Sequence, residues 1–120
     1  MPQLRYHHIG IPTDRPLPEE DYVADYEMYA SGYSQSPYGI EWMKFDQDCP
    51  LPELVKKVPH VAFVVDDLQA AIAGKEILIA PNSPVDGIMV AFIVDNGAPV
   101  EFLQFDRPED EVWPSGAKFK

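Results

Sequence analysis

Residues 40–46 read IEWMKFD, and residues 100–106 read VEFLQFD. The glutamate, the phenylalanine and the aspartate are identical in the two stretches, and three further positions pair one apolar residue with another. A second match lies upstream of each stretch, because residues 8–11 (HIGI) resemble residues 60–63 (HVAF) in pattern. The chain therefore contains two copies of one structural unit, and this duplication is the feature that most strongly predicts its fold.

The second copy is the more complete one. The apolar run at 60–65 predicts a strand, and Asp66 or Asp67 is a suitable N-cap for a short helix that follows it. Asn96 and Gly97 form a tight hairpin signal. Further strands are expected at residues 77–80, 88–95 and 99–105. The second copy is thus predicted to be a β-α-β-β-β unit.

The first copy is shorter, because fewer residues separate its histidine from its glutamate. Strands are expected at 5–12 and 38–46. The prolines and acids at 16–20 are typical of a helix start. A helical face is predicted to follow, formed by Tyr22, Val23, Tyr26 and Tyr29. The first copy is predicted to be a trimmed β-α-β or β-α-β-β unit.

These units suggest an α+β chain with four parts: a first module (1–46), a proline-rich linker (47–59), a second module (60–106) and a C-terminal tail (107–120). If the two modules pack about a pseudo-two-fold axis, their equivalent residues meet in one shared cleft. The polar side chains expected in this cleft are those of His8, Glu41, His60 and Glu101.

These four residues lie in strands that are otherwise apolar, where a carboxylate is costly unless it is paired or bound to a metal. Two neighbouring carboxylates also repel each other unless a cation lies between them. Two neutral imidazoles and two carboxylates carry a charge that a divalent cation cancels, and this N/O donor set suits Zn, Ni, Mn, Fe or Co. The alternative is two buried histidines bonded to the backbone and two glutamates on solvated faces.

The paired His and Glu strands and the segments HHIGI, PHVAFVVDDLQAA and VAFIVDNGAPVEFLQF resemble the vicinal oxygen chelate superfamily, which includes glyoxalase I, bleomycin-resistance proteins and extradiol dioxygenases. The resemblance covers roughly residues 3–106. It implies two βαβββ-type modules, the first shortened, that form a half-open barrel sheet with a central cleft. It also implies one divalent metal bound by His8, Glu41, His60 and Glu101.

The resemblance further implies a lyase or isomerase that moves a proton next to the carbonyl of a small substrate such as a 2-hydroxycarbonyl compound, with Glu101 or Glu41 carrying the proton. One alternative is a metal-free binding protein of the bleomycin-resistance type. Another is a degenerate module whose own side chains fill the cleft. Members of the superfamily commonly pair modules across a dimer, and a short first module leaves a sheet edge exposed, so we expect a homodimer.

The composition restricts the class of protein. The net charge of -11 argues against nucleic acid and anionic membranes as partners. The single cysteine excludes an intrachain disulfide framework and is compatible with a reducing compartment. The sequence has no stretch that reads as a signal peptide or a membrane span, so we expect a cytoplasmic protein.

Several residues outside this set also have expected roles. Arg5 and Tyr38 are candidates to bind an anionic substrate at the mouth of the cleft. His7 is expected to point away from His8 and to lie at the surface, because side chains alternate along a strand. Trp42 and Phe102 are expected to pack against helices on the face opposite the glutamates, and the acidic run at 109–111 is interpreted as a solvated tail.

Overall fold

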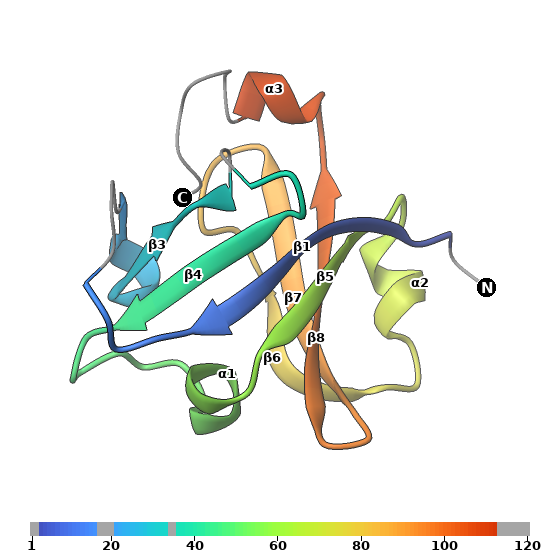
Figure 1. Cartoon of the computed structure of the whole chain (residues 1–120). Coiled ribbons are helices and arrows are strands. Elements are labelled where there is room, and N and C mark those ends of the chain that lie inside the picture. Colours follow the sequence, from blue (N-terminus) through green and yellow to red (C-terminus); the bar gives the residue numbers. More distant parts are fainter. Residues whose placement is uncertain (1–2, 17–20, 34–35, 113–120) are drawn as a thin grey trace.

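Eight strands form a single curled sheet in the part of the chain that the computed structural model describes, which is residues 3–16, 21–33 and 36–112 (Figure 1). The order of the strands across the sheet is β2-β3-β4-β1-β5-β8-β7-β6. The strands are β1 (Arg5–Pro12), β2 (Asp21–Val23), β3 (Met28–Ser31), β4 (Ile40–Phe45), β5 (His60–Val64), β6 (Glu76–Asn82), β7 (Ile88–Asp95) and β8 (Ala98–Phe105). The helices are the 3-10 turn η1 (Ala24–Tyr26), α1 (Glu53–Lys57), α2 (Leu68–Ile72) and α3 (Glu109–Val112). None of the described helices is long and apolar enough to cross a membrane.

The centre of the sheet has the symmetry that the duplication predicts. Strands β1 and β5 run antiparallel, with Ile9 opposite Val61. Each has a parallel partner on its outer side, which is β4 for β1 and β8 for β5. Exchanging the two copies therefore leaves the four central strands in the same arrangement, so a pseudo-two-fold axis passes through the Ile9–Val61 pair.

The sheet is curled so strongly that its two ends meet. Tyr26, in the turn between β2 and β3, donates a hydrogen bond from its hydroxyl to Oδ1 of Asn82 in β6, at 2.7 Å. Strands β2 and β6 are the two ends of the strand order, so this bond joins opposite edges of one sheet. The curled α+β sheet with a concave interior confirms the predicted fold class.

The second copy forms as predicted. Asp67 caps α2, because its side chain accepts a hydrogen bond from the backbone N–H of Ala70 at 3.2 Å. Asn96 and Gly97 take left-handed φ angles of 50° and 82° in the turn between β7 and β8, as a tight hairpin requires. Helix α2 packs on β7 and β8, where Phe102 is buried against it as expected.

The helix predicted for the first copy is wrong. Its residues form β2, η1 and β3 instead, and β3 pairs with β4 along its whole length. Met28 and Ala30 alternate inward and are buried together with Val23 and Met43, so the segment buries its apolar side chains with the period of a strand. The expected helix start at 16–20 falls largely on residues 17–20, which lie outside the described residues.

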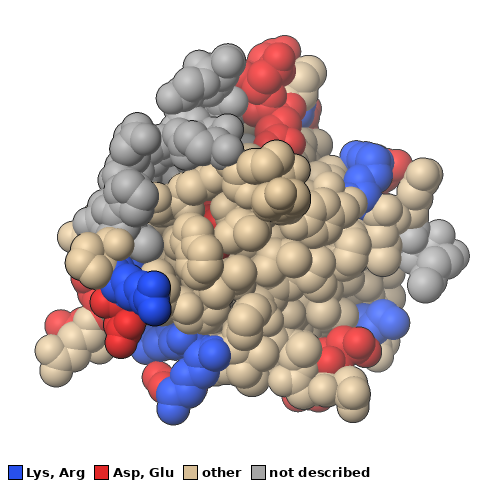
Figure 2. All heavy atoms as spheres, in the orientation of Figure 1, with Lys and Arg blue, Asp and Glu red and all other residues tan. Residues whose placement is uncertain are grey.

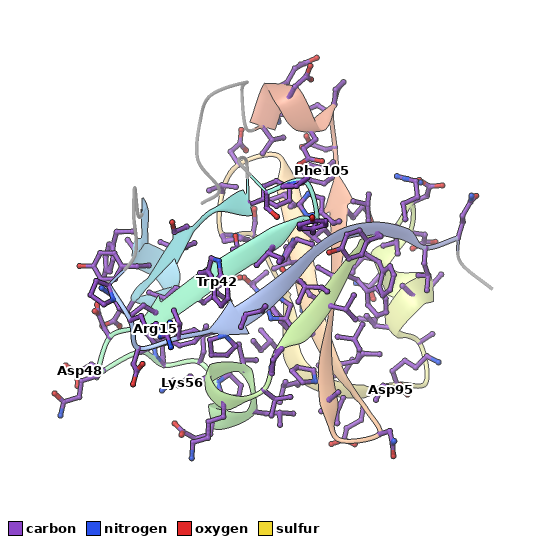
Figure 3. All side chains as sticks on the ribbon, viewed as in Figure 1. Arg15, Trp42, Asp48, Lys56, Asp95 and Phe105 are labelled. Carbon is purple, nitrogen blue, oxygen red and sulfur yellow. The ribbon has the colours of Figure 1, made fainter. Side chains whose placement is uncertain are left out.

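The missing helix changes the outer face of the first copy. Trp42 was expected to pack against a helix, but it is 40% exposed, and the residues of the helix predicted for the first copy join the sheet instead. It lies on β4, on a face over β4, β1 and β5 that carries few charged side chains, which gather around its margin (Figures 2 and 3). The homodimer expected from the sequence stays a prediction.

Candidate metal centre

The register of the central strands brings the four candidate ligands to one face of the sheet. His8 in β1 lies opposite Ala62 in β5, and Gly10 in β1 lies opposite His60 in β5. His8 and Gly10 are two residues apart, as are His60 and Ala62, so all four point to the same side. The two histidines therefore stand on one face, related by the pseudo-two-fold axis.

The two glutamates join this face from the neighbouring strands. Glu41 in β4 is level with Gly10, and Glu101 in β8 is level with Ala62. The two copies thus supply equivalent residues from equivalent positions. All four candidate ligands are at most 5% exposed, which places two carboxylates and two imidazoles in the interior of the protein.

Three of the four side chains form a compact group. Nε2 of His60 lies 3.0 Å from Oε1 of Glu101, and Nε2 of His8 lies 3.3 Å from the same oxygen. The ligand atoms of these three residues all lie within 4.8 Å of one another. Glu41 borders this group, because its Oε1 is 3.7 Å from Nε2 of His8.

The geometry of the group fits a divalent transition metal. An ion with bonds of about 2.0–2.2 Å holds neighbouring ligand atoms about 3.0–3.5 Å apart in octahedral or tetrahedral coordination. The two distances to Oε1 of Glu101 fall in this range. Two imidazole nitrogens and a carboxylate oxygen are also donors that Zn, Ni, Mn, Fe and Co accept, so His8, His60 and Glu101 can hold such an ion.

Gly10 determines where the His60 ring sits. A Cβ atom at residue 10 would lie 2.2 Å from Cε1 of His60 and 2.8 Å from both ring nitrogens, so the ring occupies the space that any other side chain would fill. Nδ1 of His60 is buried and has no hydrogen-bond partner among the described residues. The orientation of this ring therefore depends on packing over Gly10 and on its contact with Glu101.

The electrostatics of the group favour the protonation states that a metal needs. Burial raises the pKa of Glu101, but its close contacts with the imidazoles of His60 and His8 outweigh burial and lower this pKa to about 2. Burial lowers the pKa of His8, although the neighbouring Glu101 carboxylate opposes that shift. At neutral pH, Glu101 is therefore ionised and His8 is neutral, as metal ligands must be.

Acidification from pH 7.5 to 5.5 should lower the free energy of unfolding of the metal-free protein. Because the pKa of His8 is below its usual 6.5 in the folded state, the unfolded chain binds more protons under about pH 6.5. Stability then falls as the pH drops, by at most about 1.4 kcal/mol per pH unit for one proton. Glu101 adds a further loss only between its usual pKa of 4.5 and about 2.

Urea denaturation over this pH series measures the effect. The variant His8→Asn should show a flatter dependence between pH 7.5 and 5.5, whatever its absolute stability. A wild-type profile no steeper than that of His8→Asn would contradict the assignment of the slope to this residue.

A small pocket opens beside the group, between the two copies. Its cavity volume is about 30 Å³, which is room for about two water molecules. Glu41, His60 and Glu101 form its polar side. Its remaining lining is mostly apolar and consists of Val23, Tyr26, Met28, Met43, Leu51, Val55, Pro84, Ile88, Val90, Phe92 and Leu103. Bound solvent or the reacting end of a substrate at this position would face two carboxylates and one imidazole.

The two residues suggested for substrate binding lie elsewhere. Arg5 is exposed and pairs with Asp66, with Nη1 3.3 Å from Oδ1. Tyr38 is 73% exposed, and its carbonyl oxygen accepts a hydrogen bond from the Tyr6 hydroxyl at 2.8 Å. Neither residue lines the pocket. Their role in binding a substrate stays a prediction.

His7 was interpreted as a surface residue, and this is wrong. It is 6% exposed, and its Nδ1 lies 2.6 Å from Nδ1 of His8. The pairing of β1 with β5 shifts register between Tyr6 and His8, and such an irregularity breaks the strict alternation of side chains. The sequence signal available was the His-His pair itself, but the shift that turns both rings inward is not visible in it.

Glu109 was also missed, because the acidic run at 109–111 was interpreted as a solvated tail. In the structure, Oε2 of Glu109 lies 2.8 Å from Nε2 of His7 and accepts a hydrogen bond from the Tyr33 hydroxyl at 3.0 Å. These contacts join residues far apart in the chain, and no local sequence pattern predicts them.

The chain matches no protein-family profile and no curated protein. Among solved structures, it is similar to methylmalonyl-CoA epimerase from Mycobacterium tuberculosis, with a TM-score of 0.55 and 17% sequence identity over 88% of this chain and 89% of that one. That epimerase belongs to the vicinal oxygen chelate superfamily. At this level of identity the likeness shows the fold alone, and it confirms the fold expected from the repeated His and Glu strands.

Proposed function

We propose that the protein binds one divalent transition metal through His8, His60 and Glu101, with Glu41 as a fourth ligand, and that it is an isomerase-type enzyme. The reaction is proton transfer at a carbon next to the carbonyl of a small substrate. The observation that carries this proposal is the convergence of two imidazoles and one carboxylate, with a second carboxylate at the border of the group, all four buried, on the concave face of the sheet. The structural likeness to an epimerase supports the reaction class.

A divalent metal in this position supplies Lewis-acid stabilisation of the negative charge that develops on the substrate's carbonyl oxygen. Proton removal from the adjacent carbon then requires a base of the protein within reach. Both carboxylates line the pocket, so both are candidates for that base.

The surroundings of the two glutamates favour Glu41 as the residue that carries the proton. Oε1 of Glu101 lies 3.0 Å from Nε2 of His60 and 3.3 Å from Nε2 of His8, so Glu101 stands inside the group that would hold the metal, and a bound cation there would make it a weak base. Glu41 lies at the border of the compact group, farther from His8 than Glu101 is. Glu101 therefore acts as a fixed ligand in this proposal, and a Glu41 oxygen takes the proton and returns it.

The pocket restricts which part of a substrate can enter. With room for about two water molecules and a mostly apolar lining, it admits the carbonyl and the carbon beside it, and the rest of a larger substrate stays outside. Methylmalonyl-CoA, the substrate named for the structural neighbour, carries a proton of this kind next to its carbonyl groups. We therefore propose a small carbonyl compound or acyl thioester as the substrate class.

Exchange of the substrate's α-proton with solvent tests this function. The metal-loaded protein is incubated in D2O with a panel of acyl-CoA thioesters and 2-hydroxycarbonyl compounds, and NMR follows the loss of the α-proton signal. We expect metal-dependent exchange for at least one compound, with none after chelation. A protein that binds panel compounds equally well with and without metal, and exchanges no proton, would instead be a metal-free binding protein.

A further inference from the structure

A second cluster of polar side chains lies directly behind His8, on the side away from Glu101. It consists of His7 from β1, Tyr33 from the segment after β3, and Glu109 from α3. Helix α3 follows the end of β8, where Phe105 lies (Figure 3). The rings of His7 and Tyr33 stack, with centroids 4.7 Å apart at 17°. Three distant parts of the chain thus converge on His7.

The cluster forms a continuous hydrogen-bonded line into the candidate metal centre. Oε2 of Glu109 is 2.8 Å from Nε2 of His7, and Nδ1 of His7 is 2.6 Å from Nδ1 of His8. Nε2 of His8 in turn faces Glu101. The Tyr33 hydroxyl lies 2.9 Å from Nε2 of His7 and donates to Oε2 of Glu109 at 3.0 Å.

The chemistry of these groups determines the direction of the hydrogen bonds when His8 binds a metal. A neutral imidazole that binds through Nε2 must carry its proton on Nδ1, so Nδ1 of His8 has to donate to His7. His7 can accept only if its own proton is on Nε2. A carboxylate is an acceptor, and Glu109 stands at the position that receives this second proton.

We propose that His7 and Glu109 are positioning residues that hold His8 in the ring tautomer that binds the metal, with Tyr33 keeping the Glu109 carboxylate in place. The inference rests on the metal binding proposed above. Ligating histidines generally donate their other ring N–H to an acceptor, and here the acceptor is a second histidine backed by a carboxylate. The C-terminal helix α3 thereby becomes part of the metal centre.

The variant Glu109→Gln tests the proposal, and Glu111→Gln is its matched control. Both remove one negative charge from the same helix, but Glu111 is exposed. Titration with Co²⁺ should give a dissociation constant about 10–100-fold higher for Glu109→Gln than for wild type. Glu111→Gln should stay within about twofold of wild type. His7→Phe, which removes the acceptor for His8, should lose at least as much affinity as Glu109→Gln.

Two further measurements separate positioning from a general loss of structure. Urea denaturation of the metal-free variants should give similar stabilities for Glu109→Gln and Glu111→Gln. In the metal-free protein, NMR of the histidine ring nitrogens should find a larger fraction of the His8 proton on Nδ1 in wild type and in Glu111→Gln than in Glu109→Gln.

The outcomes distinguish this inference from the proposed function. If wild type binds Co²⁺ and Glu109→Gln binds it as tightly as Glu111→Gln does, the positioning role is overturned and the metal centre stands. If Glu109→Gln binds weakly but has the same His8 tautomer ratio as wild type in the metal-free protein, the tautomer argument is likewise overturned. If wild type itself does not bind Co²⁺, both the inference and the proposed function fall.

Discussion

Glu41→Gln is expected to abolish turnover while the protein keeps its fold and most of its metal affinity. Glutamine has nearly the same shape and still offers an oxygen ligand, but it cannot take a proton from carbon. Loss of a positioned general base lowers the rate by about 10²–10⁴-fold. The α-proton exchange assay measures the loss, and Co²⁺ titration of the same preparation measures the retained affinity.

Glu101→Gln is the comparison variant, because it separates the loss of a base from the loss of a metal ligand. Oε1 of Glu101 contacts both histidines, so its replacement should weaken metal binding and turnover together. A Glu41→Gln protein that binds Co²⁺ normally and still exchanges the α-proton at the wild-type rate would contradict the assignment of Glu41 as the base.

Gly10→Ala is expected to have the second largest effect, although it adds a single methyl group. The new Cβ would lie 2.2 Å from Cε1 of His60, a distance that no side-chain contact permits, and the backbone of a central strand cannot move away easily. The His60 ring must shift, which separates Nε2 from Oε1 of Glu101. We expect the affinity for Co²⁺ to fall about 100-fold. Mutation of a residue that holds a metal-binding side chain in place has an effect of this size.

The control for this prediction lies in the same strand. Ile11→Val trims a side chain on the opposite face of β1, so it should leave Co²⁺ affinity within about twofold of wild type. The measured quantity is again the dissociation constant. Unchanged affinity in Gly10→Ala would mean that His60 does not bind the metal from its position in this structure.

The centre of the molecule could be predicted because it is duplicated. Repetition of the His and Glu strands predicted both the pairing of the copies and the convergence of His8, His60 and Glu101, and Glu41 came to the border of the group. Hydrophobic patterning was enough to predict the helix and strands of the second copy, where Asp67 and the Asn96–Gly97 turn are specific local signals.

The rest could not be predicted, for separate physical reasons. The tyrosines of the first copy satisfy a helical spacing, but β-propensity and pairing with β4 decide their structure. His7 turns inward through a register shift, which a strict alternation rule cannot foresee. Glu109 reaches His7 across most of the length of the chain, a contact set by the fold as a whole.

The most direct test of the metal centre is a crystal structure of the protein grown with Zn²⁺ or Co²⁺, with the ion located by its anomalous scattering. We expect one ion per chain on the concave face, at about 2.0–2.2 Å from Nε2 of His8, Nε2 of His60 and a carboxylate oxygen of Glu101. An ion bound elsewhere, or a protein that crystallises with these side chains unliganded at saturating metal, would contradict it.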